Sequence, residues 1–136
     1  MLAVAIADLD HFKEVNDRWT HAIGDAVLKA IANLLVREVR HTDLVARYGG
    51  EEFVLVLLET GPEAAAAVCE KVRAAVERHD WSGIAPGLSI TVSIGWCADT
   101  SLPGADAMLG AADAAMYRAK AAGRNRIAGG REGARP

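Results

Sequence analysis

Short, uninterrupted apolar runs alternate along the chain with longer segments whose apolar residues recur every third or fourth position. The run at residues 2–7 is typical of a strand buried on both faces. Two further runs flank Gly49-Gly50, a pair that predicts a hairpin with a tight turn in which glycine takes positive φ. The apolar runs predict strands at residues 2–7, 43–48, 53–58, 88–96 and 126–128.

Helical periodicity predicts three helices. The first opens at Gly24-Asp25 after a short polar segment, and one of its faces carries Leu28, Ile31, Ala32, Leu35, Val36 and Val39. The other two are expected at residues 63–79 and 105–121, with Gly123 ending the last one.

The order of these elements predicts an α+β fold with a ferredoxin-like βαββαβ core, in which helices cover a central, mostly antiparallel sheet. Residues 1–128 are expected to form a single domain. The Gly- and Arg-rich residues 129–136 are expected to form a disordered tail.

Composition narrows the class of protein. A chain of 136 residues, 51% of them apolar, suits one domain with one core. The net charge of −3 argues against nucleic-acid binding, and no apolar run reaches the roughly 20 residues that span a membrane. Cys69 and Cys97 lie in apolar patterns without metal-site spacing, so we expect buried free thiols and a reducing, cytoplasmic location.

Carboxylates gather at two predicted strand ends. Asp8 and Asp10 follow the first strand, and Glu51 and Glu52 follow the hairpin glycines. Such a set suits Mg²⁺, which accepts one or two carboxylates together with substrate phosphate oxygens. From spacing alone the alternative, that these residues only mark a strand end and a solvated turn, is equally open.

Three cations, Lys120, Arg124 and Arg126, lie at and beyond the end of the last predicted helix. Taken alone they are ordinary partners of the helix dipole. Beside a metal they would instead neutralise a triphosphate. The chain has neither a GxxxxGKS/T nor a GxGxxG motif, so P-loop and Rossmann nucleotide binding are excluded.

Five segments, in order, resemble the signatures of the GGDEF domain family of diguanylate cyclases. Residues 8–17 (DLDHFKEVND) are similar to DxDxFKxxND, and residues 47–53 (RYGGEEF) to RxGG(D/E)EF. Residues 21–25 (HAIGD), 91–95 (TVSIG) and 115–125 (AMYRAKAAGRN) resemble the family's HxxGD, TxSxG and AxYxAKxxGRN elements. The resemblance covers nearly the whole chain and implies the fold of nucleotidyl cyclases and polymerase palms.

The resemblance implies a divalent metal and a proton acceptor. Mg²⁺ or Mn²⁺ would be held by Asp8, Glu51 and the main-chain carbonyl of Leu9. Glu51 or Glu52 would assist deprotonation of a 3′-hydroxyl.

GTP is the implied substrate. Asn16 and Asp25 would read guanine, because an aspartate accepts from the N1–H and 2-amino group that adenine does not offer together. Gly49 and Gly50 would let the backbone approach the nucleotide. The implied phosphate contacts come from the amides of His11 and Phe12 and from the side chains of Lys13, Lys120 and Arg124.

The implied reaction joins two GTP molecules into cyclic di-GMP and releases two pyrophosphates across a homodimer, in which each domain holds one GTP. Arg40 and Asp43 match the family's RxxD inhibitory site, where cyclic di-GMP would bind as a feedback inhibitor. Arg73 is a weaker candidate for a second cation there. An N-terminal sensor domain is the implied regulator.

The family normally begins with a further helix and a DxLTGLxNR element, which this sequence lacks ahead of its first strand. Without them we expect exposed apolar surface on one side of the sheet, and either weak binding by a monomer or self-association. The alternative function is a catalytically silent domain that binds cyclic di-GMP or GTP. An adenylyl-type cyclase or a polymerase palm is disfavoured by Asn16 and Asp25.

Overall fold

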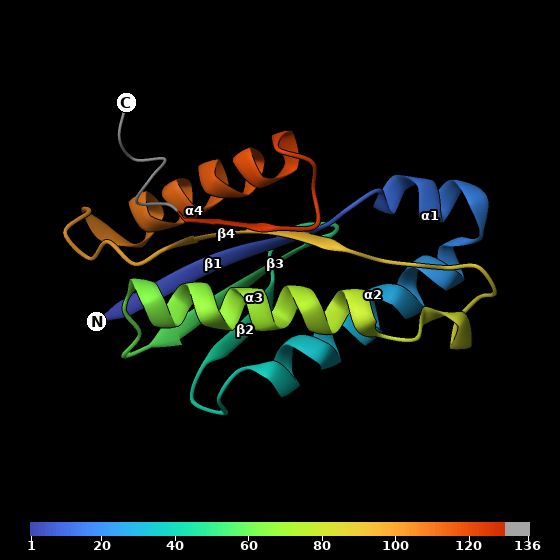
Figure 1. Ribbon diagram of the computed structural model, residues 1–136, viewed down its shortest axis with the longest axis horizontal. Coiled ribbons are helices and arrows are strands. Elements are labelled where there is room, and N and C mark those ends of the chain that lie inside the picture. Colours follow the sequence, from blue (N-terminus) through green and yellow to red (C-terminus); the bar gives the residue numbers. More distant parts are fainter. Residues whose placement is uncertain (130–136) are drawn as a thin grey trace.

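A five-stranded sheet lies at the centre of the molecule (Figure 1). The structure, a computed structural model, describes residues 1–129. Neighbouring strands are antiparallel in the order β2-β3-β1-β4, and β5 pairs in parallel with β4. This is the strand order of a ferredoxin-like core, so the predicted α+β fold is confirmed. The strands are β1 (Leu2–Leu9), β2 (Leu44–Arg47), β3 (Glu52–Leu58), β4 (Val92–Cys97) and β5 (Ile127–Gly129).

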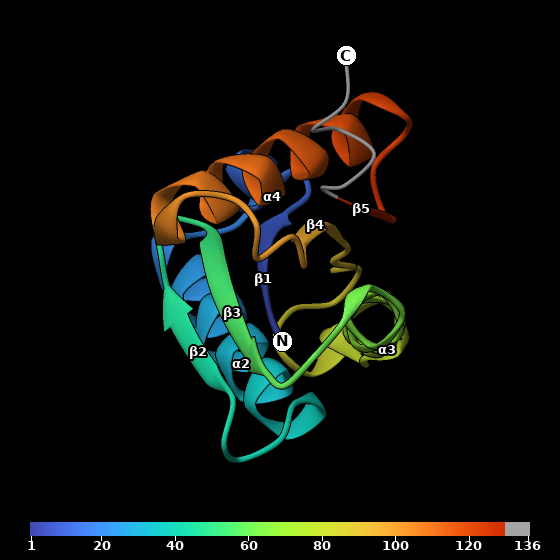
Figure 2. The same ribbon diagram turned by 90° about the vertical axis from the view of Figure 1, so that its left-hand side faces the viewer.

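Helices pack on both faces of the sheet: α2 and α3 lie on one face and α4 on the other (Figures 1 and 2). The short α1 lies beyond the end of β1. A 3₁₀ turn at Trp81–Gly83 follows α3. The helices are α1 (Phe12–Arg18), α2 (His21–Glu38), α3 (Pro62–Arg78) and α4 (Gly104–Ala121). None of these described helices is long and apolar enough to cross a membrane.

Alternation along the strands divides the core into two layers. Ala3 and Ala5 of β1 pack with Leu55 of β3 in the larger layer, against α2 and α3. Val4 and Ile6 point the other way and pack in the smaller layer against α4. Because β1 is central and buried on both faces, its apolar run is uninterrupted, as the sequence predicts.

The close packing of α4 on the sheet depends on one glycine. A Cβ built on Gly95 of β4 would lie 2.1 Å from both the carbonyl oxygen of Ala112 and the amide nitrogen of Met116. Only a residue without a side chain therefore lets the α4 backbone approach β4 this closely.

Part of the sheet face on which α4 packs stays uncovered. α4 lies over β1 and β4, whereas the same face of β2 and β3 carries Leu44 and Leu58, which are 62% and 40% exposed. The predicted exposed apolar surface on one side of the sheet is present.

Cys69 and Cys97 are buried free thiols, as predicted, and burial raises the pKa of Cys69 to about 12.

The segment after β1 contains a helix that the sequence analysis did not predict. α1 occupies the segment that reads as polar, with Phe12 and Val15 buried at a spacing of three residues. α2 then begins at His21 and not at Gly24, because the Thr20 hydroxyl accepts a hydrogen bond of 3.2 Å from the N–H of Ile23 and caps the helix earlier.

The predicted apolar face of α2 is wrong at one residue. Val36 is 60% exposed, because the buried face of the helix runs through Val27 and Leu34 together with Leu28, Ile31 and Leu35. Val36 instead borders a groove between α2 and the sheet, described below.

The strand predicted at residues 88–96 begins only at Val92 in the structure, four residues later than expected. Leu88 and Ile90 are buried in the larger core layer but belong to no strand. Their alternation therefore reflects burial of an irregular segment that follows a turn at Gly87, where φ is +82°.

The hairpin turn and the C-terminal end of the domain also differ from the prediction. Gly49 and Gly50 do not take positive φ, and a wider turn is closed by hydrogen bonds from the N–H groups of Tyr48 and Gly49 to the Glu52 carbonyl oxygen. At the C-terminus, Gly129 is a buried residue of β5, although the sequence assigns it to the tail. The rest of the predicted tail, residues 130–136, lies outside the described residues.

Candidate nucleotide and metal site

The end of β1 gathers residues that are far apart in the sequence. Because β1 lies between β3 and β4, Asp8 pairs with Glu52 on one side and with Ser93 on the other. Asp8 and Asp10 point to the α4 face, and Lys120 in the last turn of α4 reaches both of them. The Lys120 Nζ lies 3.3 Å from the Oδ1 atom of each aspartate.

Asp8 is an incompletely satisfied carboxylate. Its Oδ1 atom is buried and accepts no hydrogen bond, although the Lys120 ammonium lies nearby. Burial raises the pKa of Asp8 above its ordinary value, and the opposing charge of Lys120 does not offset this. A buried acceptor of this kind, beside other carboxylates, suits a divalent cation.

The two glutamates of the turn extend the negative cluster. Burial raises the pKa of Glu51, and the charge of Asp8 raises it further. The pKa of Glu52 is also raised, by burial first and then by its hydrogen bond with Asp8 and the charges around it, including Asp113 of α4. The described residues contain no cluster of three or more His, Cys, Asp or Glu that could hold a metal by itself. A Mg²⁺ ion that shares its ligands with substrate phosphates needs only one or two of these carboxylates.

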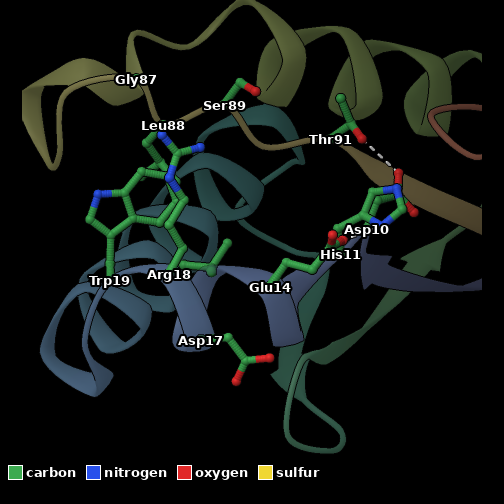
Figure 3. A pocket seen from close by; sticks show the side chains of 11 residues that line it. Asp10, His11, Glu14, Asp17, Arg18, Trp19, Gly87, Leu88, Ser89 and Thr91 are labelled. Carbon is green, nitrogen blue, oxygen red and sulfur yellow. Dashed lines mark hydrogen bonds and ion pairs between the residues drawn. The ribbon is translucent and has the colours of Figure 1, made fainter.

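Asp10 has a different environment from Asp8, two residues away on the same face. It is 3% exposed, and its carboxylate accepts a hydrogen bond of 2.7 Å from the Thr91 hydroxyl (Figure 3). The Ser93 hydroxyl donates a second one, also at 2.7 Å. The main-chain N–H of Asn125 donates a third, at 3.0 Å. Burial by itself would raise the pKa of Asp10, but these hydrogen bonds lower it overall. Asp10 therefore holds the scaffold together and has little free capacity for a metal.

The residues predicted to read guanine lie on two adjacent helices. A Cβ built on Gly24 of α2 would lie 2.2 Å from the Oδ1 atom of Asn16 on α1, so the Asn16 amide rests directly against the start of α2. Asp25 follows Gly24 and is exposed. It borders a groove of about 610 Å³, within the size range of small-molecule sites, lined by Asp25, Leu28, Lys29, Ala32, Val36, Val45, Arg47 and Phe53.

The predicted phosphate-binding groups surround the carboxylates. His11 takes a left-handed conformation with φ of 57° and caps α1, so the first N–H groups of that helix have no partner within it. Lys13 and Arg124 are exposed, whereas Lys120 is partly buried against the aspartates. The Leu9 main chain is tied to the turn, because its N–H donates to the Glu51 carbonyl at 3.2 Å.

Arg47 supports the turn that carries the glutamates, a role that the sequence analysis did not assign. Its guanidinium donates to the carbonyl oxygens of Gly49 at 3.2 Å and Gly50 at 2.6 Å. A Cβ built on Gly50 would have no atom within 4 Å, so the space beside the turn is open to a ligand.

Arg40 and Asp43 lie together at a separate groove of about 370 Å³ at the other end of β3. Asp43 accepts hydrogen bonds from Arg40 and, at 3.0 Å, from the N–H of Leu58, and its side chain is 2% exposed. Burial opposes ionisation, but these donors lower the pKa of Asp43 overall. From α3 the groove is lined by Ala64, Val68 and Lys71, of which Lys71 carries a positive charge.

Arg73, the weaker candidate for this groove, is instead engaged elsewhere. Its guanidinium binds Glu70, Glu77 and Asn125, and it does not line the groove. Helical geometry explains the difference, because residues two apart on a helix point in different directions.

A third groove, of about 630 Å³, lies between α1 and the irregular segment before β4 (Figure 3). The Arg18 guanidinium lies 4.6 Å from the centre of the Trp19 ring. Glu14 and Asp17 add carboxylates to the lining of the groove. Its lining shares only Asp10 and His11 with the residues discussed above as candidates for metal or nucleotide binding.

Comparison with known proteins identifies relatives of this arrangement. A family model described as diguanylate cyclase, GGDEF domain, matches residues 1–126. The diguanylate cyclase DgcP of Pseudomonas aeruginosa is 44% identical over 126 residues, which are 93% of this chain and 19% of that protein. Diguanylate cyclase A of Treponema denticola is 39% identical over 127 residues, 93% of this chain and 34% of that protein. The chain therefore spans only a fifth to a third of the length of these relatives.

Solved structures resemble the fold closely. The GGDEF domain of DgcB from Caulobacter crescentus, in complex with c-di-GMP, superposes with a TM-score of 0.88 at 32% identity, covering 96% of this chain and 78% of that one. The active GGEEF domain of a diguanylate cyclase from Vibrio cholerae gives a TM-score of 0.87 at 30% identity, covering 94% and 81%.

Proposed function

The chain belongs to the GGDEF domain family of diguanylate cyclases, and on that premise we propose that it condenses two GTP molecules into cyclic di-GMP with release of two pyrophosphates. The observation that carries this proposal is the meeting of Asp8, Glu52 and Lys120 at the end of β1, with one buried Asp8 oxygen left without a hydrogen bond. Carboxylates for a metal and a cation for phosphates are thereby within reach of one another.

Mg²⁺ or Mn²⁺ fits this cluster. Asp8 and Glu51, with the Leu9 carbonyl, would hold it. Burial is the main cause that raises the pKa of both acids, so their ionised forms are poorly compensated in the fold and a bound cation would stabilise them. When bound, the metal would stabilise the charge on the phosphate groups and hold them for attack.

The chain's own groups then serve the transfer step. The 3′-hydroxyl oxygen of one GTP attacks the α-phosphorus of the other, its proton passes to Glu51 or Glu52, and the bond to pyrophosphate breaks. Their raised pKa values make these two carboxylates better proton acceptors than an ordinary exposed glutamate. Lys120 and Arg124 would neutralise the departing phosphates.

Guanine selection is assigned to Asn16 and Asp25. The carboxylate of Asp25 would accept from the N1–H and 2-amino group of guanine, whereas adenine would leave it without donors. The groove that Asp25 borders and the close packing of Asn16 on Gly24 support this assignment.

The reaction requires two copies of the domain, because one copy holds one GTP and supplies only half of the reacting groups. We therefore propose a homodimer in which the two sites face each other. A sensor domain elsewhere in the polypeptide would control this pairing, in keeping with the greater length of the relatives. The two buried free thiols support a reducing, cytoplasmic location.

A catalytically silent domain that binds cyclic di-GMP is the second candidate function. It is supported by the groove at Arg40 and Asp43, with Lys71 beside them. In the active enzyme the same groove would serve feedback inhibition by the product.

The test is incubation with GTP and Mg²⁺ at several protein concentrations, followed by chromatography of the products. We expect cyclic di-GMP from GTP and no cyclic product from ATP, with a rate that rises more steeply than protein concentration. Glu51→Gln should abolish the product, whereas Glu63→Gln, at an exposed position on α3, should not. Absence of product at every concentration, with retained binding of cyclic di-GMP, would select the silent domain.

A further inference from the structure

The segment between α4 and β5 has an unusual backbone. Gly123, Arg124 and Asn125 take φ values of +130°, +65° and +47° in succession. Residues with side chains rarely adopt this left-handed region, and each such residue costs free energy that the surroundings must supply. The segment carries Arg124 and begins within three residues of Lys120, which lies in the last turn of α4, so its conformation bears on where these two cations lie.

The Asn125 side chain connects this segment to α3. Its Oδ1 atom accepts a hydrogen bond of 2.8 Å from the Arg73 guanidinium, and its amide nitrogen donates one of 2.8 Å to the Glu77 carboxylate. An amide suits this position because it offers one acceptor and one donor, which match a cation and an anion. Asparagine also tolerates the left-handed conformation better than most residues do.

Arg73 is itself held in one orientation. Its guanidinium donates to both oxygens of Glu70, at 2.9 and 2.6 Å, and to Glu77 at 2.9 Å. Its side chain is only 16% exposed. Ion pairs within one helix are ordinarily weak, but a bidentate guanidinium that also bridges to another segment fixes geometry.

The other end of the connection is Asp10. Its carboxylate accepts the Asn125 main-chain N–H and lies 3.3 Å from the Lys120 ammonium. The chain of contacts from α3 through Asn125 to Asp10 therefore fixes the Arg124 segment and Lys120 against the end of β1, beside Asp8.

We propose that Asn125, held by Arg73 and Glu77 of α3, is a positioning residue that sets the geometry with which Arg124 and Lys120 meet the phosphates of GTP. This inference rests on the proposed function of the site. It assigns Asn125 no contact with the nucleotide, and it gives Arg73 a role outside the groove of Arg40.

Asn125→Gly tests the proposal, because glycine keeps the left-handed backbone and the N–H to Asp10 while it removes both side-chain hydrogen bonds. We expect binding of a non-hydrolysable GTP analogue to weaken about tenfold and kcat/KM to fall roughly 10- to 100-fold, the effect of slightly displaced groups. Binding of guanosine, which has no phosphates, should not change. In an Arg124→Ala background the same substitution should weaken analogue binding by a clearly smaller factor, because one of the two cations that it positions is absent.

Arg73→Lys is the second variant, since it keeps the charge and removes the forked geometry. Arg78→Lys, at an exposed position on the same helix, is its matched control and should bind the analogue as the unaltered protein does. Thermal unfolding of each variant establishes that it is folded. If Asn125→Gly proves unfolded, Arg73→Lys decides the question by the same analogue-to-guanosine comparison.

Unchanged analogue binding in folded Asn125→Gly would overturn the inference, and so would an equal loss with and without Arg124. An equal loss of guanosine and analogue binding would also overturn it, because that result indicates a general structural role. Failure of the unaltered protein to bind the GTP analogue would refute the proposed function itself, and the inference with it.

Discussion

Gly95 offers the sharpest test of how α4 is placed on the sheet. In Gly95→Ala the new methyl carbon would lie 2.1 Å from two backbone atoms of α4, the Ala112 oxygen and the Met116 nitrogen. Real Cβ atoms essentially never approach other atoms within 3.0 Å. Because both neighbours belong to a helix backbone, neither can rotate away, and α4 as a whole must move outward by about 1 Å.

The cost follows from this displacement. Overpacking a well-packed core costs about 1–3 kcal/mol and occasionally more. A contact with rigid backbone on two sides belongs at the upper end, so we expect the free energy of unfolding to fall by about 3 kcal/mol. For a domain of this size that loss corresponds to a decrease in Tm of roughly 10 °C.

Gly110, within α4, provides a control for which the expected change in stability has the opposite sign. A Cβ built on Gly110 would have no atom within 4 Å, so Gly110→Ala adds only helix propensity and should stabilise the protein by about 0.5–1 kcal/mol. Urea unfolding monitored by circular dichroism measures both variants. A Gly95→Ala protein within 0.5 kcal/mol of the unaltered chain would show that α4 does not pack on β4 as described.

Three further predictions concern the sites. Gly24→Ala would bring a Cβ 2.2 Å from the movable Asn16 amide, so titration calorimetry should show about tenfold weaker GTP binding with little change in Tm. The pKa of Asp43 lies below its ordinary 3.8, so its ionised form stabilises the fold above that pH, and the stability is lost as pH falls through the lower folded value. Asp43→Asn should therefore lower the unfolding free energy near neutral pH by roughly 1–3 kcal/mol and flatten the acid side of a Tm–pH curve. The pKa of Asp8 is raised, so its ionised form is disfavoured in the fold. Asp8→Asn should therefore not lower the Tm at neutral pH without metal, but Mg²⁺ should no longer raise the Tm of this variant. A decrease in the Tm of the metal-free variant would contradict this reasoning.

Much of the fold could be predicted because its signals are local. The apolar run of β1, the two runs around the glycine pair and the periodicity of α3 and α4 each lie within one element. The errors arose where tertiary contacts decide the structure. α1 has only Phe12 and Val15 to bury, and Leu88 and Ile90 are buried without strand pairing.

The candidate site shows the same division. The motifs indicated these residues, and the pairing of β1 with β3 together with the packing of α4 on the sheet brings Asp8, Glu52 and Lys120 together. The RxGG(D/E)EF motif includes Arg47 but does not say that it supports the turn, and no motif indicates that Arg73 binds Asn125, 52 positions away. The Arg73–Asn125 contact depends on the face that α3 presents and on its packing beside β5, which no short window of sequence contains.

Asp8 and Asp10 show why sequence alone could not assign their roles. They lie two residues apart, point to the same face and share Lys120 at the same distance of 3.3 Å. Yet the pKa of one is raised by burial, and the pKa of the other is lowered by hydrogen bonds from Thr91, Ser93 and Asn125. These donors come from β4, the segment before it and the turn after α4, more than 80 positions along the chain. The satisfied aspartate can therefore anchor the scaffold at little cost, whereas the unsatisfied one keeps an acceptor free, and a cation that binds it gains the stabilisation that the fold by itself does not provide.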